Sequence, residues 1–247
     1  MEILLWILGS TFLVSLVSLI GIFTLSLKDE MLNRILLLLV GFSAGAMMGG
    51  AFLHLLPESS EKITIMDAGI YLLTGFSLFF LIERILHWHH CHERECDVHT
   101  LSYMNLIGDG VHNFIDGVII AVSFLVSIPL GIVSTLAIIA HEIPQEIGDF
   151  GVLLYGGFTK LRALLFNFLS AITAIAGALS GYFLSASIEG ITSFILPFAA
   201  GGFIYIAASD LIPELHKEPR LGKSLMSFTF FMIGIIFMLA IKLIFEH

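Results

Sequence analysis

Eight long apolar runs, separated by short polar or glycine-containing segments, fill the sequence almost from end to end. Each run is long enough to cross a bilayer as a helix, which takes about 20 mostly apolar residues. A helix satisfies its own backbone hydrogen bonds, so helices are the structure that this pattern predicts in lipid. The predicted spans are residues 3–26, 33–56, 67–86, 101–126, 131–154, 161–184, 191–213 and 224–245.

The composition favours one membrane domain over residues 1–247. Hydrophobic residues make up 57% of the chain and charged residues 13%, whereas a soluble domain carries about a quarter charged residues. We therefore expect an all-α integral membrane protein that crosses the lipid bilayer eight times. The sequence has no basic cluster, so nucleic-acid binding is not expected.

Basic residues predict the orientation of the spans. Of the 11 Lys and Arg residues, only Lys62 and Lys242 fall on the side that holds both termini. The others lie in or beside the segments after the first, third, fifth and seventh spans. Because basic residues collect on the cytoplasmic side, we expect both termini outside the cell. The membrane in question is expected to be the cell membrane.

The fourth predicted span carries a polar stripe. His112 and Asp116 lie one helical turn apart on one face, with Asn113 beside them and Asp109 a turn earlier. Ionisable residues are costly in a bilayer and indicate a functional site. An imidazole, a carboxylate and an amide oxygen suit a divalent ion such as zinc. A buried hydrogen-bond network that locks helix packing is the structural alternative.

The fifth predicted span is even more polar, and it contains Pro144. Five polar side chains in nine residues must face the protein interior or a water path, which favours a metal or proton pathway; they are His141, Glu142, Gln145, Glu146 and Asp149. His141 and Gln145 share one face. Pro144 removes a backbone donor, so it is expected to kink the helix and to free a carbonyl that ligates metal or holds a water.

Together the two spans offer six candidate ligands for one ion or for two adjacent ions: His112, Asn113, Asp116, His141, Glu142 and Gln145. Nitrogen and oxygen donors without a cysteine fit zinc first, and also fit iron(II), manganese or cadmium. The weaker ligands Asn113 and Gln145 suit a carrier, which must release what it binds. The metal is thus expected as transported substrate and not as a cofactor.

The HNFIDG stretch at 112–117 and the HEIPQE stretch at 141–146 resemble the signature helices of the ZIP family of metal transporters. The likeness is closest to the histidine-rich branch of that family and extends over the whole chain. It implies a helical bundle of eight spans with both termini outside, and a homodimer. It also implies a two-metal centre between the fourth and fifth spans that uses the six residues above, with Asp116 and Gln145 placed between the ions.

Two departures from the family pattern leave the number of metals open. Gln145 stands where that branch usually has a second His, and a neutral amide cannot bridge two cations as a carboxylate does. Some family members supply a carboxylate from the sixth span, where this chain offers only Asn167 and Ser170.

The segment 87–99 holds five His, two Cys and three acidic residues, and it is expected in the cytoplasm between the third and fourth spans. Such a composition binds zinc in several arrangements, which favours a zinc acceptor or sensor near the exit. A solvated polar loop with incidental affinity is the alternative. Near the membrane surfaces, His54 and Glu58 are candidates for an entrance, and Asp210 and Glu214 for an exit.

Two other functions share part of this pattern. Intramembrane zinc proteases use HExxH, but Gln145 occupies the last position here and Pro144 disturbs the turn. Cation exporters with an HxxxD pair match His112 and Asp116, but they usually have six spans, and eight are predicted. The sequence therefore predicts no enzyme, but a transporter that takes zinc up into the cytoplasm. Its L-(L/I)-P-E tetrapeptides at 55–58 and 211–214 are also compatible with an inverted repeat.

Overall fold

The computed structural model describes residues 2–24, 28–88, 98–187 and 190–245. Every regular element in these ranges is a helix, and eight continuous helical stretches are long and apolar enough to cross a membrane. All eight predicted spans are thereby confirmed. In chain order the elements are α1 (Glu2–Val17), η1 (Ser18–Ile20), α2 (Gly21–Thr24), α3 (Asp29–Gly49), η2 (Gly50–Leu55), α4 (Leu56–Ser60), α5 (Ile65–Trp88), α6 (Val98–Val126), α7 (Ile128–Tyr155), α8 (Lys160–Ala171), α9 (Thr173–Ser187), α10 (Ile191–Ile206), η3 (Ala207–Leu211), α11 (Ile212–His216) and α12 (Leu221–Phe245).

The second and seventh spans are longer than predicted, because neither ends at its proline. The second span runs on through Pro57 to Ser60, and the seventh runs on through Pro213 to His216. In each case a π-helical turn, η2 or η3, lies immediately before the proline-containing helix. Widening the helix there relieves the clash between the proline ring and the preceding turn. The two similar tetrapeptides therefore also share a local structure.

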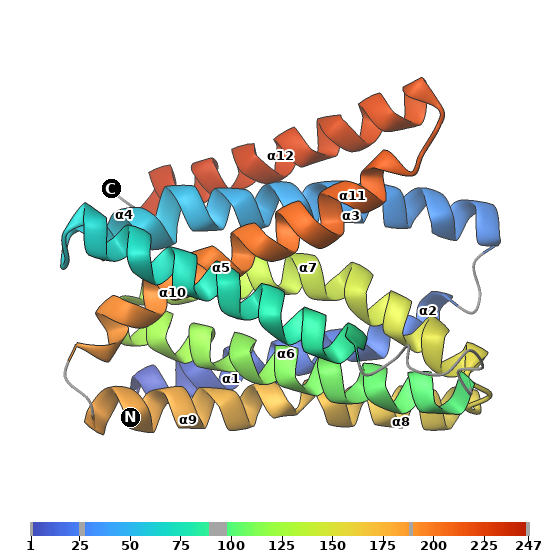
Figure 1. Ribbon diagram of the computed structural model, residues 1–247, viewed down its shortest axis with the longest axis horizontal. Coiled ribbons are helices and arrows are strands. Elements are labelled where there is room, and N and C mark those ends of the chain that lie inside the picture. Colours follow the sequence, from blue (N-terminus) through green and yellow to red (C-terminus); the bar gives the residue numbers. More distant parts are fainter. Residues whose placement is uncertain (1, 25–27, 89–97, 188–189, 246–247) are drawn as a thin grey trace.

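The helices lie side by side along the long axis of the molecule (Figure 1). α6 packs on α9, α3 on α12, and α5 on α10, while α7 contacts α1, α3 and α6. The two polar helices are among the most buried: the buried share of the apolar stretch is 56% for the α6 span and 61% for the α7 span, equal to the 61% of the span that contains α10, against 17% for α5 and 22% for α12. The expensive polar stripes thus face protein and not lipid.

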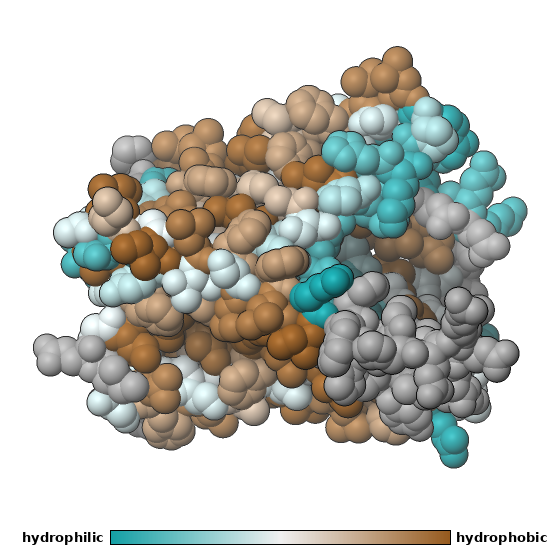
Figure 2. Space-filling model, viewed as in Figure 1, coloured by the Kyte–Doolittle hydropathy of each residue, from teal (hydrophilic) through white to brown (hydrophobic). Residues whose placement is uncertain are grey.

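The two ends of the bundle differ in character. The first turn of α1 and the last turn of α12 lie at the same end (Figure 1), as an even number of spans requires. At the opposite end, hydrophilic residues gather around α11 and the start of α12, while the sides of the bundle are mostly hydrophobic (Figure 2). Exposed side chains such as Leu73 on α5 and Phe228 on α12 give the sides their apolar surface.

A tight turn fixes α6 against α7. Ser127 is the one residue between them, and its extended backbone (φ −160°, ψ 152°) reverses the chain. Its hydroxyl caps α7 by accepting a hydrogen bond from the Leu130 amide at 3.2 Å. Further along, Ser134 donates to the Ser123 hydroxyl at 2.8 Å. The turn sets the register that places residues 112–116 opposite residues 141–142.

α6 and α9 touch backbone to backbone. A Cβ added to Gly117 would lie 1.9 Å from the Ala174 carbonyl oxygen, and one added to Gly177 would lie 1.9 Å from the Phe114 carbonyl oxygen. Small residues at such crossings let membrane helices approach closely. This contact therefore fixes the position of the part of α6 that carries the polar stripe.

Candidate metal centre

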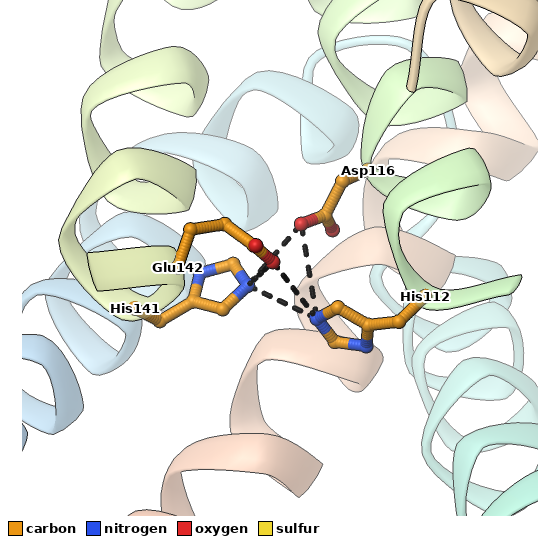
Figure 3. Close-up of side chains that lie close together, drawn as sticks. All are labelled: His112, Asp116, His141 and Glu142. Atoms are coloured by element: carbon orange, nitrogen blue, oxygen red, sulfur yellow. Dashed lines mark hydrogen bonds and ion pairs between the residues drawn. The ribbon is translucent and has the colours of Figure 1, made fainter. Parts of the chain in front are cut away.

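Four side chains from α6 and α7, two from each helix, converge on one point between the helices (Figure 3). The Nε2 atoms of His112 and His141 lie 3.1 Å apart. His141 Nε2 is 3.2 Å from Asp116 Oδ2 and 3.4 Å from Glu142 Oε1. His112 Nε2 is 3.8 Å from that Asp116 oxygen and 3.5 Å from that Glu142 oxygen. One ligand atom from each residue lies within 4.8 Å of all the others.

The centre is shielded from water. Asp116, His141 and Glu142 are each 1% exposed, and the His112 side chain is 17% exposed. Asp116 Oδ2 and both Glu142 carboxylate oxygens have no hydrogen-bond partner in the part of the chain that the structure describes. Buried carboxylates without donors are costly unless a cation compensates them. Two imidazoles and two carboxylates form a donor set that suits four-coordinate zinc.

A backbone contact orients the His141 ring. Its Nδ1 lies 3.2 Å from the Ala137 carbonyl oxygen, one turn earlier on α7. Nδ1 carries the proton in this contact, because a carbonyl oxygen only accepts. The lone pair of Nε2 is therefore directed at the centre, as in zinc sites where a second partner fixes the tautomer of the ligating His.

Asn113 and Gln145 point to a neighbouring residue, Asp109. Asn113 Nδ2 donates to Asp109 Oδ1 at 2.9 Å, and Gln145 Nε2 donates to the same oxygen at 3.3 Å. Of the six predicted ligands, four are thus brought together at the centre. The other two, Asn113 and Gln145, instead donate hydrogen bonds to Asp109. Their assignment as metal ligands stays a prediction.

A second group, of three acidic residues, lies beside the first; Glu142 was in the predicted ligand set, but Asp109 and Glu146 were not. One oxygen each from Asp109, Glu142 and Glu146 lie within 4.8 Å of one another, and all three residues are buried. The signal was in the spacing, since Glu142 and Glu146 are one turn apart on α7. Asn167 and Ser170 lie near this group: Asn167 donates to the Glu146 carboxylate, and Ser170 donates to the Leu106 carbonyl at 3.0 Å.

The residues that follow the centre along α6 and α7 differ between the two ends of the bundle. Toward the end that holds the termini, α6 and α7 continue with buried apolar side chains such as Ile120, Phe124, Val133 and Ile138. Toward the other end, polar residues continue along α7, where Asp149 accepts a hydrogen bond from Asn105 at 2.9 Å. Charged and amide side chains thus continue from the centre toward this end, whereas the buried polar side chains of α6 and α7 toward the termini are hydroxyls such as those of Ser123 and Ser134.

The carbonyl that Pro144 frees is already engaged. Pro144 lacks the amide that would bond to the Ala140 carbonyl, and the hydroxyl of Ser43 on α3 donates to that carbonyl instead. This bond supplies the donor that the proline removes; a role of the oxygen in ligating metal or holding a water stays a prediction. α7 runs unbroken through the proline from Ile128 to Tyr155.

The remaining predicted residues are placed as follows. His54 and Glu58 line a pocket of about 190 Å³ at the end that holds the termini, together with Glu61 and Lys242. Asp210 in η3 and Glu214 in α11 are exposed near the opposite end, where Glu214 pairs with Lys217 at 2.5 Å. The side chains of segment 87–99 lie outside the described residues.

Comparison with known proteins decides the family. The chain matches the ZIP zinc transporter family over residues 3–99 and 89–242. It belongs to the ZIP family. That membership confirms the resemblance of the two signature helices, and it places this multi-pass membrane protein among transporters and not among enzymes.

Several curated relatives of this ZIP chain carry zinc in their names. The zinc transporter ZIP13 homolog of Drosophila melanogaster is 29% identical over 89% of this chain and 81% of its own length. The zinc transporter ZIP13 of Pongo abelii is 31% identical over 83% of this chain and 66% of its own length. The zinc transporter YKE4 of Saccharomyces cerevisiae is 29% identical over 85% of this chain and 70% of its own length.

Proposed function

We propose that this protein carries zinc into the cytoplasm across the cell membrane, through a centre formed by His112, Asp116, His141 and Glu142. One observation carries the proposal: four ligand atoms of the types that bind zinc lie within 4.8 Å of one another in the middle of a membrane bundle. The names of the relatives support zinc as substrate. Iron(II), manganese and cadmium fit the same donors.

The direction of transport is supported by the charge distribution and by the path. Lys160 and Arg162 at the start of α8, and Lys217, Arg220 and Lys223 around the start of α12, lie at the end of the bundle opposite the termini. The positive-inside rule makes that end cytoplasmic. The charged and amide side chains that continue from the centre lead to the same end, and on the outer side α6 and α7 carry buried side chains that are apolar or hydroxyl-bearing. This arrangement fits a carrier that has admitted its ion from outside and is open to the cytoplasm.

The experiment is uptake of radioactive zinc into proteoliposomes that contain the purified full chain. Saturable uptake is expected, and His141→Ala and Asp116→Ala are each expected to abolish it at equal protein content. Ser134→Ala is the matched control, because it removes a buried contact between the same two helices on the outer side of the centre. Zinc movement out of the cytoplasmic side, or uptake that survives both substitutions, contradicts the proposal.

A further inference from the structure

The long helices pack as two groups. We call α3, α5, α10 and α12 the α3 half, and α1, α6, α7, α8 and α9 the α7 half. Within each half, backbones touch: a Cβ added to Gly45 of α3 would lie 1.9 Å from the Phe231 carbonyl oxygen of α12, and one added to Gly201 of α10 would lie 2.0 Å from the Leu72 carbonyl oxygen of α5. Gly117 marks the same kind of contact between α6 and α9. Such closely fitted pairs leave no room for one helix to shift along the other.

The boundary between the two halves is looser beside the proposed zinc centre. A Cβ added to Gly50 of η2, which continues α3, would lie 3.5 Å from the Ala137 Cβ of α7, an ordinary van der Waals distance. The rings of Phe79 on α5 and His112 on α6 meet edge to face, with centroids 6.5 Å apart. Apolar contacts of this kind are non-directional, so similar contacts can replace them when the two surfaces shift.

A directional contact crosses this boundary at the centre. The fully buried hydroxyl of Ser43 on α3 donates a hydrogen bond to the Ala140 carbonyl of α7, the residue before the proposed ligand His141. This carbonyl has no helical donor, because Pro144 stands four residues later. The hydrogen bond of an essential donor thus joins the α3 half to the helix that carries the centre.

A proline on α4 shows that the donor can also come from within one half. The Leu53 carbonyl lies four residues before Pro57, and the Lys242 Nζ of α12 donates to it at 2.7 Å. Both helices belong to the α3 half, so this bond is kept whatever the α7 half does. The donor for Ala140, in contrast, is lost if the two halves separate.

Ser43 has a second acceptor on its own helix. Its hydroxyl oxygen also lies 2.7 Å from the Leu39 carbonyl oxygen, one turn earlier on α3. A hydroxyl has one proton, and this proton can turn wholly to Leu39 when α7 moves away. Ser43 then stays paired, whereas the Ala140 carbonyl loses its donor. The cost of separating the halves at this point therefore falls on α7 alone.

We propose that Ser43 is a latch of the transport cycle, which holds the α7 half in the conformation described here and releases it when the carrier opens to the outside. This role rests on the proposed function, because it concerns a carrier that alternates between two faces. The conformation described here has the character of the one open to the cytoplasm. Removing the latch is therefore expected to favour the conformation that is open outward.

A cysteine at position 133 can report outward opening. Val133 of α7 is 2% exposed and lines the pocket that η2 and α7 form at the end of the bundle that holds the termini. The measurement is the rate at which a polar maleimide labels Val133→Cys in the purified full chain, in lipid nanodiscs, with Cys91→Ser and Cys96→Ser as background. Labelling of a buried position follows the population of the open conformation.

Ser43→Ala is expected to raise this labelling rate by roughly 3–10-fold, the factor that one hydrogen bond in a membrane protein is worth. Ser43→Thr keeps the hydroxyl and should restore the wild-type rate. Pro144→Ala should also raise the rate, because the alanine amide then serves the Ala140 carbonyl, and adding Ser43→Ala to it should change little. Ser180→Ala is the matched control, since its hydroxyl bonds only within α9.

Zinc uptake distinguishes a latch from a merely structural contact. A larger outward-open population lowers the apparent KM for zinc added outside by a similar factor, whereas general damage to the fold does not increase affinity. An unchanged labelling rate in Ser43→Ala, an equal increase with and without Pro144, or a KM that does not fall overturns the latch. If labelling behaves as expected but the wild-type chain takes up no zinc, the latch stands as a conformational contact and the proposed function fails.

Discussion

The Ser43 hydroxyl on α3 donates a hydrogen bond to the backbone carbonyl of Ala140 on α7, immediately before the proposed ligand His141. This carbonyl lacks its helical donor because Pro144 stands four residues later. A side chain from another helix thus replaces the missing amide. The contact explains how α7 tolerates a proline beside the centre, and it ties α3 to the helix that carries two of the four proposed ligands.

Ser43→Ala is expected to lower the free energy of unfolding by roughly 0.6–2 kcal/mol, since it leaves a buried carbonyl unpaired in a membrane helix. In a Pro144→Ala background the loss should be smaller, because the alanine amide restores the helical donor. Unfolding of the purified protein in detergent measures both values. Ser180→Ala is the control, as its hydroxyl bonds only within its own helix, to Ala176. An equal loss in the two backgrounds would show that the contact does not compensate the proline.

Gly117→Ala is expected to destabilise the protein by about 1–3 kcal/mol through overpacking. The added Cβ would lie 1.9 Å from the Ala174 carbonyl oxygen, so α6 must move away from α9. Because α6 carries His112 and Asp116, zinc uptake should fall as well. Gly148→Ala on α7 is the matched control, because nothing lies within 4 Å of the added Cβ. Alanine has a better helix propensity than glycine, so the stability of this variant should be unchanged or raised. Similar unfolding temperatures and uptake for the two variants would contradict this account.

Hydropathy alone was enough to predict the eight spans, because a bilayer demands long apolar helices. The four residues that converge were also readable, since i, i+4 spacing puts His112 above Asp116 on one face. The contact of Asn113 with Asp109 spans one turn of α6 and fits the same spacing, but the contact of Gln145 with Asp109 was not readable, because it depends on the register between α6 and α7 that the Ser127 turn sets. Contacts such as Ser43 with Ala140 join residues 97 positions apart, and no local pattern indicates them. The two acids Asp109 and Glu146 were visible as polar positions, but their pairing across helices was not.

Zinc is expected to raise the unfolding temperature of the metal-depleted protein. Binding to the folded state alone stabilises it by RT ln(1 + [L]/Kd), which is about 2.7 kcal/mol at a free zinc concentration of 100 Kd. His141→Ala and Asp116→Ala should remove most of this gain, and a chelator should reverse it in the wild type. Ser134→Ala should keep it, because its contact with Ser123 lies away from the ligands. Full stabilisation of the His141 variant by zinc would place the main binding site elsewhere.

The pocket at the end of the bundle that holds the termini is expected to help capture the ion. Glu58 and Glu61 line a pocket of about 190 Å³ at the end of the bundle that holds the termini, and negative charge at a mouth concentrates cations there. Glu58→Gln and Glu61→Gln should therefore raise the KM for zinc uptake and leave the maximal rate nearly unchanged. The effect should shrink at high ionic strength, which screens exposed charges. Glu214→Gln removes an exposed acid at the opposite end and should leave KM for uptake unaltered. A lower maximal rate with constant KM would instead assign the two glutamates to the conformational change of the carrier.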